Sequence, residues 1–426
     1  MKKIIGSFLI VTCLFVASCS DIDDITRENS VTEANYTTQS TFRNTPKFSK
    51  RELIIQYKKH TPPNRKAALR SYYGAVEYEV CAHCDGTLEK WDFGPGADLE
   101  NKLGSVRSGS GGAESIQNVI TEFNFKFEQE VATLNGGSGN SYDSDKIVSP
   151  DNEGVIIAVL DSGIDTNYPT LEESAPFLYN ASNLGIPGVY SGWDYVNGDN
   201  NCYDDDTLVH GTAVSSLMHT SLNNVEVPFQ LLPVKIANHQ GEVSIFNMLC
   251  GMLFALPKAD ILQISAGWYD AAGANPYTTA IFLDVLSEYE DVLVVTSAGN
   301  SNLDNDGQIA HYPSNFSALT NNVIAIAATN HEATDASYFT NYGRNTVDFI
   351  TNGTYIPFVN HMDQPVLISG TSFSAPLVTA VAARILYNSG MTYTPLEIKN
   401  QLDYQGIPVN YTKPTKYDKY IPHFYQ

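Results

Sequence analysis

Residues 370–376 read Gly-Thr-Ser-Phe-Ser-Ala-Pro, and the interpretation of the whole chain starts from this stretch. An apolar run from Val366 to Ile368 precedes it, and Pro376 opens a run of apolar residues with helical spacing. Ser372 is therefore expected at or near a helix N-terminus, where unpaired backbone N–H groups and the helix dipole favour an oxyanion. A serine there becomes a nucleophile only if a histidine accepts its proton and a third residue orients that histidine.

Three further stretches supply residues that could act together with Ser372. Val155 to Leu160 reads as a strand buried on both faces, and Asp161 follows at its carboxyl end, where open α/β sheets place their sites. His210 opens a helix-like segment with the sequence His-Gly-Thr. Asn300 ends a second buried-strand pattern in a Gly-Asn turn, where its amide can donate to a developing oxyanion.

These stretches together resemble the signature blocks of the subtilisin-like serine proteases, or subtilases, in the order of that family. The resemblance covers roughly residues 150 to 405. It implies that Ser372 is the nucleophile, His210 the general base and then acid, and Asp161 the residue that orients the imidazole. Asn300, with the backbone N–H of Ser372, would form the oxyanion hole. Taken singly, each residue also fits a structural role such as a helix cap or a turn.

The pattern between His210 and Asn300 alternates strands and helices, which predicts a parallel sheet with helices on both faces. For residues 150–426 we therefore expect a subtilisin-like, three-layer α/β domain with a mainly parallel sheet. The expected strands are residues 230–236, 260–265, 292–297 and 347–350, and the expected helices are residues 243–256, 278–289 and 395–402.

The resemblance also implies a specificity pocket with walls of small residues, which leave room for a sizeable apolar group. His311 falls where the family places the pocket floor, although an ordinary loop histidine is the alternative. The two walls are Ser265, Ala266 and Gly267, and Ser297, Ala298 and Gly299.

Residues 47–134 show the element order β-α-β-β-α-β of a small ferredoxin-like α+β domain. This order is similar to the inhibitory prosegments of subtilases, whose C-terminal tail lies in the active-site cleft; an unrelated α+β domain is the alternative. We expect Val131 to Leu134 in the cleft and a processing site in the polar linker at residues 135–149. The expected strands are residues 52–57, 76–80, 88–93 and 125–134, and the expected helices are residues 62–72 and 113–123.

Residues 1–18 read as a signal peptide that ends in a sequence resembling a bacterial lipobox, Val-Ala-Ser before Cys19. Lipid on Cys19 and a flexible tether at residues 19–46 would anchor the chain to the cell envelope, at the periplasmic or surface face of a bacterial outer membrane. Cutting the linker would then release the catalytic domain. An ordinary signal peptide cleaved nearby is the alternative.

Charge divides at the linker: residues 135–426 hold 9 Lys and Arg against 30 Asp and Glu, while residues 1–134 hold 16 against 17. An acidic catalytic domain argues against nucleic acid or an anionic membrane surface as a partner. Catalysis by this residue set needs no cofactor, but a loop rich in hard oxygen ligands predicts structural Ca²⁺, with a solvated acidic loop as the alternative. The candidate ligands are Asp199, Asn201, Asp204 and Asp205.

Four cysteines lie beyond the signal peptide and Cys19. Cys81 and Cys84, in a turn between two expected strands, favour a tight disulfide over a metal site, a redox sensor or free thiols. Cys202 and Cys250 either pair or remain free, and their spacing does not decide between the two.

The function predicted from these patterns is a serine endopeptidase that acts on protein or peptide substrates through an acyl-enzyme. It would be made as a lipid-anchored precursor inhibited by its own prodomain. The alternative from a different class is a catalytically silent, subtilase-like binding or scaffold protein, against which the complete catalytic set argues.

Overall fold

The computed structural model describes residues 46–108, 119–129, 142–184, 186, 189–271 and 279–425. The expected signal peptide, Cys19 and the tether up to residue 45 lie outside these residues, and so do residues 130–141, which include Val131 to Leu134 and the first part of the linker. Among the described residues, no helix has both the length and the apolar character needed to cross a membrane.

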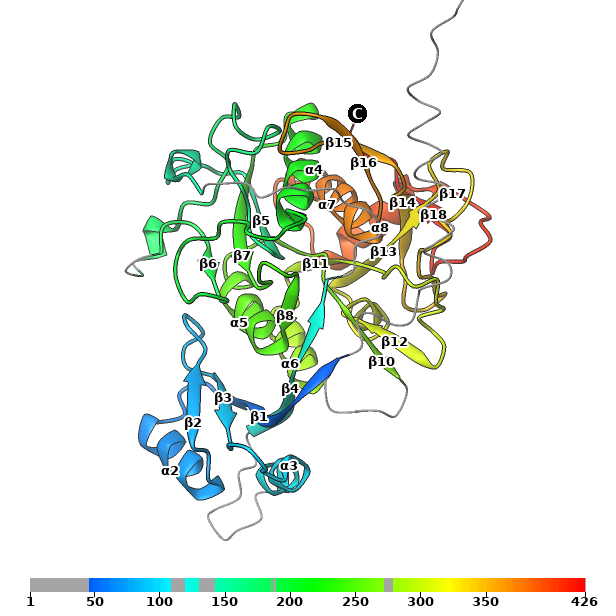
Figure 1. The fold of residues 1–426 in the computed structure, drawn as a ribbon. Helices are drawn as coiled ribbons and strands as arrows, with labels where there is room; N and C mark the ends of the chain where they lie inside the picture. Colours follow the sequence, from blue (N-terminus) through cyan, green and yellow to red (C-terminus); the bar gives the residue numbers. More distant parts are fainter. Residues whose placement is uncertain are drawn as a thin grey trace, which may run out of the picture. The chain divides into compact units, whose positions relative to one another are not determined.

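A nine-stranded sheet forms the centre of the C-terminal region, residues 142–425, in the order β17-β18-β14-β13-β11-β9-β5-β7-β6 (Figure 1). Neighbouring strands pair in parallel throughout, except β17 with β18. The predicted mainly parallel sheet is confirmed. Its strands are β5 (Val155–Asp161), β6 (Trp193–Asp194), β7 (Phe229–Lys235), β9 (Ile261–Ile264), β11 (Leu293–Ser297), β13 (Val323–Thr329), β14 (Phe349–Asn352), β17 (Ile407–Pro408) and β18 (Lys419–Tyr420).

Helices cover both faces of this sheet because its strands are apolar on both sides. In β5, Ile157 and Val159 belong to one buried cluster with α4, α7 and α8, whereas Ala158 and Leu160 belong to another with α5 and α6. This arrangement confirms the predicted three-layer α/β domain. The helices are α4 (His210–Asn224), α5 (Ile245–Ala255), α6 (Ala280–Glu288), α7 (Thr371–Asn388) and α8 (Pro395–Gln405).

Helix α7 begins earlier than the sequence predicts. We expected Pro376 to open the helix, but α7 begins at Thr371 and contains Pro376. A proline inside a helix has no N–H for the carbonyl four residues before it, which here is the carbonyl of Ser372. That carbonyl accepts a 2.8 Å hydrogen bond from the Ser265 hydroxyl instead. Ser372 therefore lies in the first turn of α7 and is tied to the residue that follows β9.

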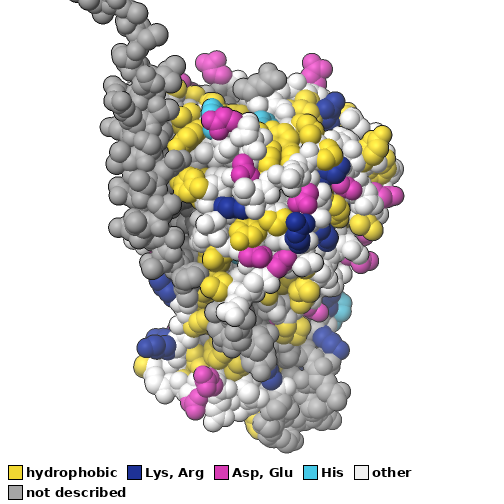
Figure 2. All heavy atoms as spheres, turned by 90° about the vertical axis from the view of Figure 1, so that its right-hand side faces the viewer, with side chains coloured by type: hydrophobic (Ala, Val, Ile, Leu, Met, Phe, Trp, Pro, Cys, Tyr) yellow, Lys and Arg dark blue, Asp and Glu magenta, His cyan; other side chains and the backbone are white. Residues whose placement is uncertain are grey.

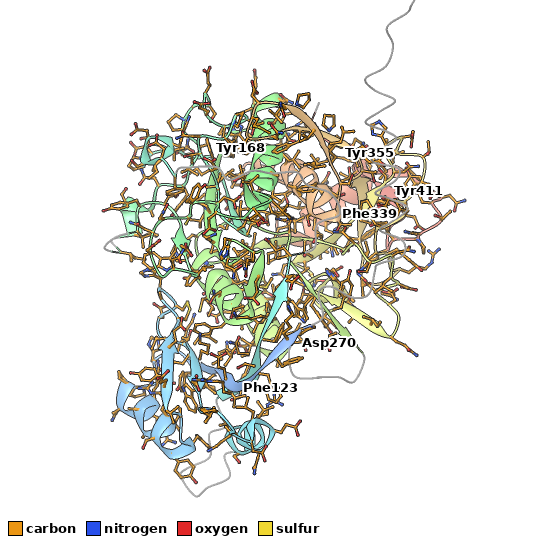
Figure 3. The ribbon with its side chains drawn as sticks, viewed as in Figure 1. Phe123, Tyr168, Asp270, Phe339, Tyr355 and Tyr411 are labelled. Carbon is orange, nitrogen blue, oxygen red and sulfur yellow. A yellow bond between two sulfur atoms is a disulfide. The ribbon has the colours of Figure 1, made fainter. Side chains whose placement is uncertain are left out.

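The N-terminal region, residues 46–129, forms an antiparallel sheet in the order β2-β3-β1-β4. Its core contains Leu53, Leu69, Trp91 and Leu103, and Phe123 of β4 packs against that core (Figure 3). The predicted β-α-β-β-α-β order is confirmed. The elements are β1 (Lys47–Tyr57), α2 (Pro63–Tyr73), β2 (Glu77–Val80), β3 (Leu88–Asp92), α3 (Leu99–Ser108) and β4 (Val119–Glu128).

Two of the predicted boundaries in this region are wrong. The second helix is α3, which comes before the expected helix at residues 113–123, and the described part of that stretch is the start of β4. Phe123, Phe125 and Phe127 alternate with polar residues at the period of a strand. The strand therefore begins earlier in the chain than the expected residue 125. The end predicted for this strand, Leu134, lies outside the described residues.

The N-terminal sheet continues into the C-terminal region. Its fifth strand is β8 (Glu242–Ser244), which pairs antiparallel with β4 through Lys126↔Ser244, Phe127↔Val243 and Glu128↔Glu242. Phe125 and Phe127 are buried in the same cluster as Trp268 of the C-terminal region. The two regions thus share backbone hydrogen bonds as well as an apolar contact.

Cys81 and Cys84 form a disulfide, as predicted, whereas Cys202 and Cys250 are both buried and unbridged.

The acidic excess of the C-terminal region is not visible as a single patch on the face in Figure 2, where acidic and basic side chains are interspersed.

Glu122 of β4 is a buried carboxyl group at the contact between the two regions. Its Oε1 accepts a 3.1 Å hydrogen bond from the backbone N–H of Ile281 in α6. Burial raises the pKa of Glu122 from 4.5 to about 8, against smaller opposing effects of that hydrogen bond and of Arg107. Because the folded-state pKa is raised, the stability linked to this proton is fully present below pH 4.5 and is lost as the pH rises through about 8.

We predict that Glu122→Gln, which stays neutral at every pH, raises the melting temperature relative to wild type, and that the difference grows from about pH 5 to about pH 8. The corresponding difference in free energy of unfolding between Glu122→Gln and wild type is on the order of 4 kcal/mol at alkaline pH. Thermal unfolding at a series of pH values measures it. Glu128→Gln on the same strand, whose side chain is 46% exposed, is the control. A difference that does not change with pH would contradict the prediction.

Candidate active site

Asp161 and His210 meet in the interior of the C-terminal region. Asp161 is the last residue of β5 and His210 the first of α4, and the Nδ1 of His210 lies 2.7 Å from the Oδ1 of Asp161. The two side chains are 1% and 0% exposed, respectively. Water therefore does not compete for this hydrogen bond, and the carboxylate sets the orientation of the imidazole.

Glycine allows the two chain segments to approach this closely. A Cβ at Gly211 would lie 2.3 Å from the carbonyl oxygen of Gly163 and 3.1 Å from the Cβ of Asp161. The backbone N–H of Gly211 also donates to the hydroxyl of Ser162 at 2.9 Å. A larger residue at position 211 would therefore push α4 away from the end of β5.

The electrostatics of the pair oppose the effect of burial. Burial by itself raises the pKa of a carboxyl group and lowers that of an imidazole. Attraction between the two groups and their hydrogen bond outweigh burial, so the pKa of Asp161 is lowered and that of His210 is raised. Asp206 and Asp204 contribute to the raised pKa of His210. The histidine is thus a stronger base than an isolated buried imidazole would be.

The acidic loop before α4 supports the position of His210. The Oδ2 of Asp204 accepts hydrogen bonds from the backbone N–H and the hydroxyl of Thr212, at 2.9 and 2.6 Å. Asp206 accepts a longer bond, 3.3 Å, from the backbone N–H of His210. Negative charge at a helix N-terminus is stabilising, so these carboxylates hold the first turn of α4.

The carboxylates of the expected Ca²⁺ ligand set make internal contacts. Asp204 is occupied by Thr212, Asp205 pairs with Lys235 at 2.7 Å, and Asp199 caps the backbone N–H of Asn201. Among the described residues, the acidic loop forms no group of three acidic, His or Cys side chains close enough to share an ion. Asp199, Asn201, Asp204 and Asp205 remain a predicted Ca²⁺ site, in which the carboxylates of Asp204 and Asp205 also contact Thr212 and Lys235.

Ser372 is held by hydrogen bonds through both its carbonyl and its hydroxyl. The carbonyl accepts from Ser265, as described above, and the Ser372 Oγ donates a long, 3.3 Å bond to the carbonyl of Ser265. The Nε2 of His210 is buried and makes no hydrogen bond within the described part of the chain. The proton path from serine to histidine is thus not closed in this conformation.

Asn300 lies beside the same turn of α7. Its Oδ1 accepts hydrogen bonds from both the backbone N–H and the hydroxyl of Thr371, each at 2.9 Å. The Thr371 hydroxyl in turn accepts from the backbone N–H of Gly299 at 3.1 Å. Because the oxygen end of the amide is fixed by Thr371, the donor end of Asn300 has a defined direction. The sequence offered no sign of this role for Thr371 beyond its place beside Ser372.

Three of the predicted pocket residues, Gly267, Gly299 and His311, lie close together. A Cβ at Gly267 would lie 2.7 Å from two ring atoms of His311, and one at Gly299 would lie 3.0 Å from a third. His311 lies on β12 (Ile309–Tyr312), its Nδ1 is 2.9 Å from the Ser314 hydroxyl, and burial lowers its pKa to about 3. His311 is therefore neutral and lies against both glycine-containing walls. Ser265 and Ala266 follow β9, Ser297 ends β11, and Ala298 follows it.

A residue of the N-terminal region reaches the Asp161–His210 pair. The side-chain amide of Gln129 donates to the Oδ1 of Asp161 at 2.9 Å, and its backbone N–H donates to the carbonyl of Gly241 at 2.8 Å. Gln129 directly follows β4, and the segment expected in the cleft, Val131 to Leu134, lies outside the described residues. Sequence reasoning missed Gln129 because only the pairing of β4 with β8 brings it to the site.

A family model described as the subtilase family matches residues 152–403, more than half of the 426 residues. The chain belongs to the subtilase family. This match contains Asp161, His210, Asn300 and Ser372, and the peptidase domain of the family supports serine protease activity.

Individual subtilases resemble the chain at low sequence identity. The subtilase-type proteinase RRT12 of Saccharomyces cerevisiae is 26% identical over 258 residues, 58% of this chain and 45% of that protein. The cuticle-degrading protease of Metarhizium anisopliae is 25% identical, over 56% of this chain and 55% of that protein. This subtilase thus spans about half the length of these two relatives. For thermitase of Thermoactinomyces vulgaris the identity is 25%, over 58% of this chain and 81% of thermitase.

Among solved structures, a lanthipeptide protease matches with a TM-score of 0.50 and 19% identity, over 63% of this chain and 85% of that one. This similarity supports the fold alone.

We predict that Thr212→Val lowers the free energy of unfolding of this subtilase by about 1–3 kcal/mol, because Asp204 and the N–H of Asp165 both lose a buried hydrogen-bond partner. Thr212→Ser keeps the hydroxyl and should cost less. Urea unfolding of both variants at neutral pH measures the difference. A loss in Thr212→Val no larger than that in Thr212→Ser would contradict the prediction that the hydroxyl carries the effect.

Proposed function

We propose that this subtilase is a serine endopeptidase that cleaves peptide bonds in protein or peptide substrates through an acyl-enzyme on Ser372. The observation that carries the proposal is the buried 2.7 Å hydrogen bond between Asp161 and His210, in a chain whose Ser372 lies in the first turn of α7, next to Thr371, which bonds Asn300. Membership of a peptidase family supports it.

In this proposal the Ser372 hydroxyl first leaves the carbonyl of Ser265 and turns toward the Nε2 of His210, since its present 3.3 Å bond is weak. His210 takes the proton as Ser372 attacks the substrate carbonyl, and Asp161 stabilises the imidazolium. The Asn300 amide and the Ser372 backbone N–H meet the developing oxyanion. When the tetrahedral intermediate collapses, His210 gives the proton to the leaving amine. Water then attacks the acyl-enzyme by the same steps and releases the acyl group. Subtilases need no cofactor for this chemistry.

We predict that a fluorophosphonate labels the processed wild-type protein covalently and that Ser372→Ala abolishes the label. Ser374→Ala is the control, because Ser374 is buried on the same helix but donates to Asn352 at 3.0 Å. The labelling rate should fall as the pH drops through the pKa of His210, which lies above 6.5, because protonated imidazole cannot accept the serine proton. Mass spectrometry of the intact chain measures the label.

If processed wild type takes up no label at any pH, the endopeptidase proposal fails and the alternative of a catalytically silent scaffold gains support. Labelling that persists in Ser372→Ala would instead show that another residue is the nucleophile.

We further propose that the N-terminal region is an inhibitory prosegment. Its last described strand, β4, lies along β8 by backbone pairing, as an extended peptide substrate would, and the next residue, Gln129, donates to Asp161. Phe127 anchors this strand, because its ring is 1% exposed and lies 5.5 Å from the Trp268 ring. Cleavage in the linker would separate this region from the catalytic domain. Lipid on Cys19, which rests on sequence alone, would place the precursor in the cell envelope.

We predict that the uncleaved precursor reacts with fluorophosphonate more slowly than the processed enzyme, and that Phe127→Ala speeds the reaction of the precursor. Truncating a buried phenylalanine costs about 3–5 kcal/mol of docking free energy, so a gain of roughly 10²-fold or more is expected. Lys126→Ala is the control, because its ion pair with Glu242 is exposed and worth about 1 kcal/mol or less. Equal labelling rates of wild-type precursor and processed enzyme would refute inhibition.

A further inference from the structure

Three cysteine sulfurs lie together where the N-terminal region contacts the C-terminal region. Cys81 and Cys84 form the disulfide in the turn between β2 and β3, and Cys250 on α5 carries a free thiol. All three sulfurs are within 4.8 Å of one another, and the Cys84 Sγ is 3.6 Å from the carbonyl oxygen of Cys250. The three residues are buried. The disulfide of one region therefore faces a thiol of the other.

Specific contacts fix the turn in this position. The hydroxyl of Tyr195 donates to the carbonyl of Ala82 at 2.8 Å. The ring of His83 packs edge-on against Trp193, with centroids 4.3 Å apart. Both partners belong to the C-terminal region, so the approach of the three sulfurs does not depend on one isolated contact.

We propose that Cys250 exchanges with the Cys81–Cys84 disulfide and thereby joins the two regions covalently. The Cys250 thiolate attacks the Sγ of Cys84, the Cys81–Cys84 bond breaks, and a Cys84–Cys250 bond forms. Cys81 leaves as a thiolate and takes up a proton equivalent to the one lost by Cys250. One disulfide and one thiol are present before and after the step, so no oxidant or reductant is consumed.

Burial makes the exchange slow while the two regions are in contact. It holds the pKa of the Cys250 thiol well above its usual value, which leaves little of the thiolate that attacks a disulfide. Partial opening of the contact admits water, raises the thiolate fraction and exposes the disulfide. Uncatalysed rearrangement of this kind takes minutes to hours.

A metal site is the competing use of the three sulfurs. Structural Zn²⁺ is bound by four ligands, whereas this group consists of three cysteines, and no His, Asp or Glu of the described residues joins it. Two of the three are already bonded to each other. The observations therefore favour exchange over metal binding.

The consequence for regulation rests on the proposed function of the N-terminal region as an inhibitory prosegment. After the linker is cut, a Cys84–Cys250 bond would keep β4 beside the active site at high effective concentration. Release of the N-terminal region from the catalytic domain would then require a reductant or thiol–disulfide exchange in the reverse direction. The exchange itself requires no proteolytic activity.

The test is disulfide mapping on the full chain carrying Ser372→Ala, which excludes self-cleavage. The protein is equilibrated in glutathione redox buffers, quenched with acid, alkylated under denaturing conditions and digested with trypsin. Residues 71–90 contain both Cys81 and Cys84, and residues 236–258 contain Cys250, so each falls in one tryptic peptide. We expect these two peptides linked through Cys84 and Cys250, with Cys81 alkylated.

Cys250→Ser should abolish the linked species, whereas Cys202→Ser should leave it unchanged, because Cys202 is equally buried but is not part of the group. Recovery of only the Cys81–Cys84 disulfide with alkylated Cys250 in every buffer would overturn the proposal. Stoichiometric zinc in the reduced protein that is lost in Cys250→Ser would also overturn it, in favour of a metal site. Because the test protein lacks the Ser372 hydroxyl, neither outcome depends on endopeptidase activity.

Discussion

The hydrogen bond between Asp161 and His210 is the interaction on which the rest of the site depends. A buried carboxylate and imidazole are stable together only if each offsets the cost of removing the other from water. The surrounding chain is arranged to keep the two within 2.7 Å. Gly211 allows the close approach, and Asp204 holds the first turn of α4 through Thr212. The position of the histidine therefore rests on residues that never touch a substrate.

Buried Lys235 also stabilises the chain next to Asp161 and the acidic loop before α4. Its ammonium group donates to the carbonyls of Ser162 and Ala237 and to the carboxylate of Asp205. A buried lysine needs such partners, because an unpaired ammonium group in the interior is costly. The acidic residues that suggested a cation site in the sequence thus serve partly as partners for Lys235 and for the backbone of α4.

The second constraint is the short edge strand β8. An exposed strand edge offers unpaired backbone groups to any extended chain, and β4 satisfies them through pairs such as Phe127↔Val243. Backbone pairing carries little sequence information, so specificity at this edge falls to side chains such as Phe127 and Gln129. The contact that covers the edge thus uses the same physical means by which an extended peptide would be bound.

Local patterns in the sequence predicted the fold class, the main alternation of strands and helices, and Asp161, His210, Asn300 and Ser372 as candidate site residues. Strand and helix periodicity and polar residues at strand ends are local signals, so they can be recognised without knowing which distant segments meet. The sequence also predicted the Cys81–Cys84 disulfide, since the two residues are close along the chain.

Which distant groups meet cannot be inferred from local patterns and is known from the folded chain. Gln129 reaches Asp161 across the β4–β8 pairing, Cys250 faces the disulfide of another region, and Ser265 bonds the carbonyl that Pro376 leaves unpaired. The acidic loop turned inward to bond backbone and side chains. Such contacts depend on how segments far apart in the sequence pack against each other. Local sequence patterns do not say how close two such segments lie in space.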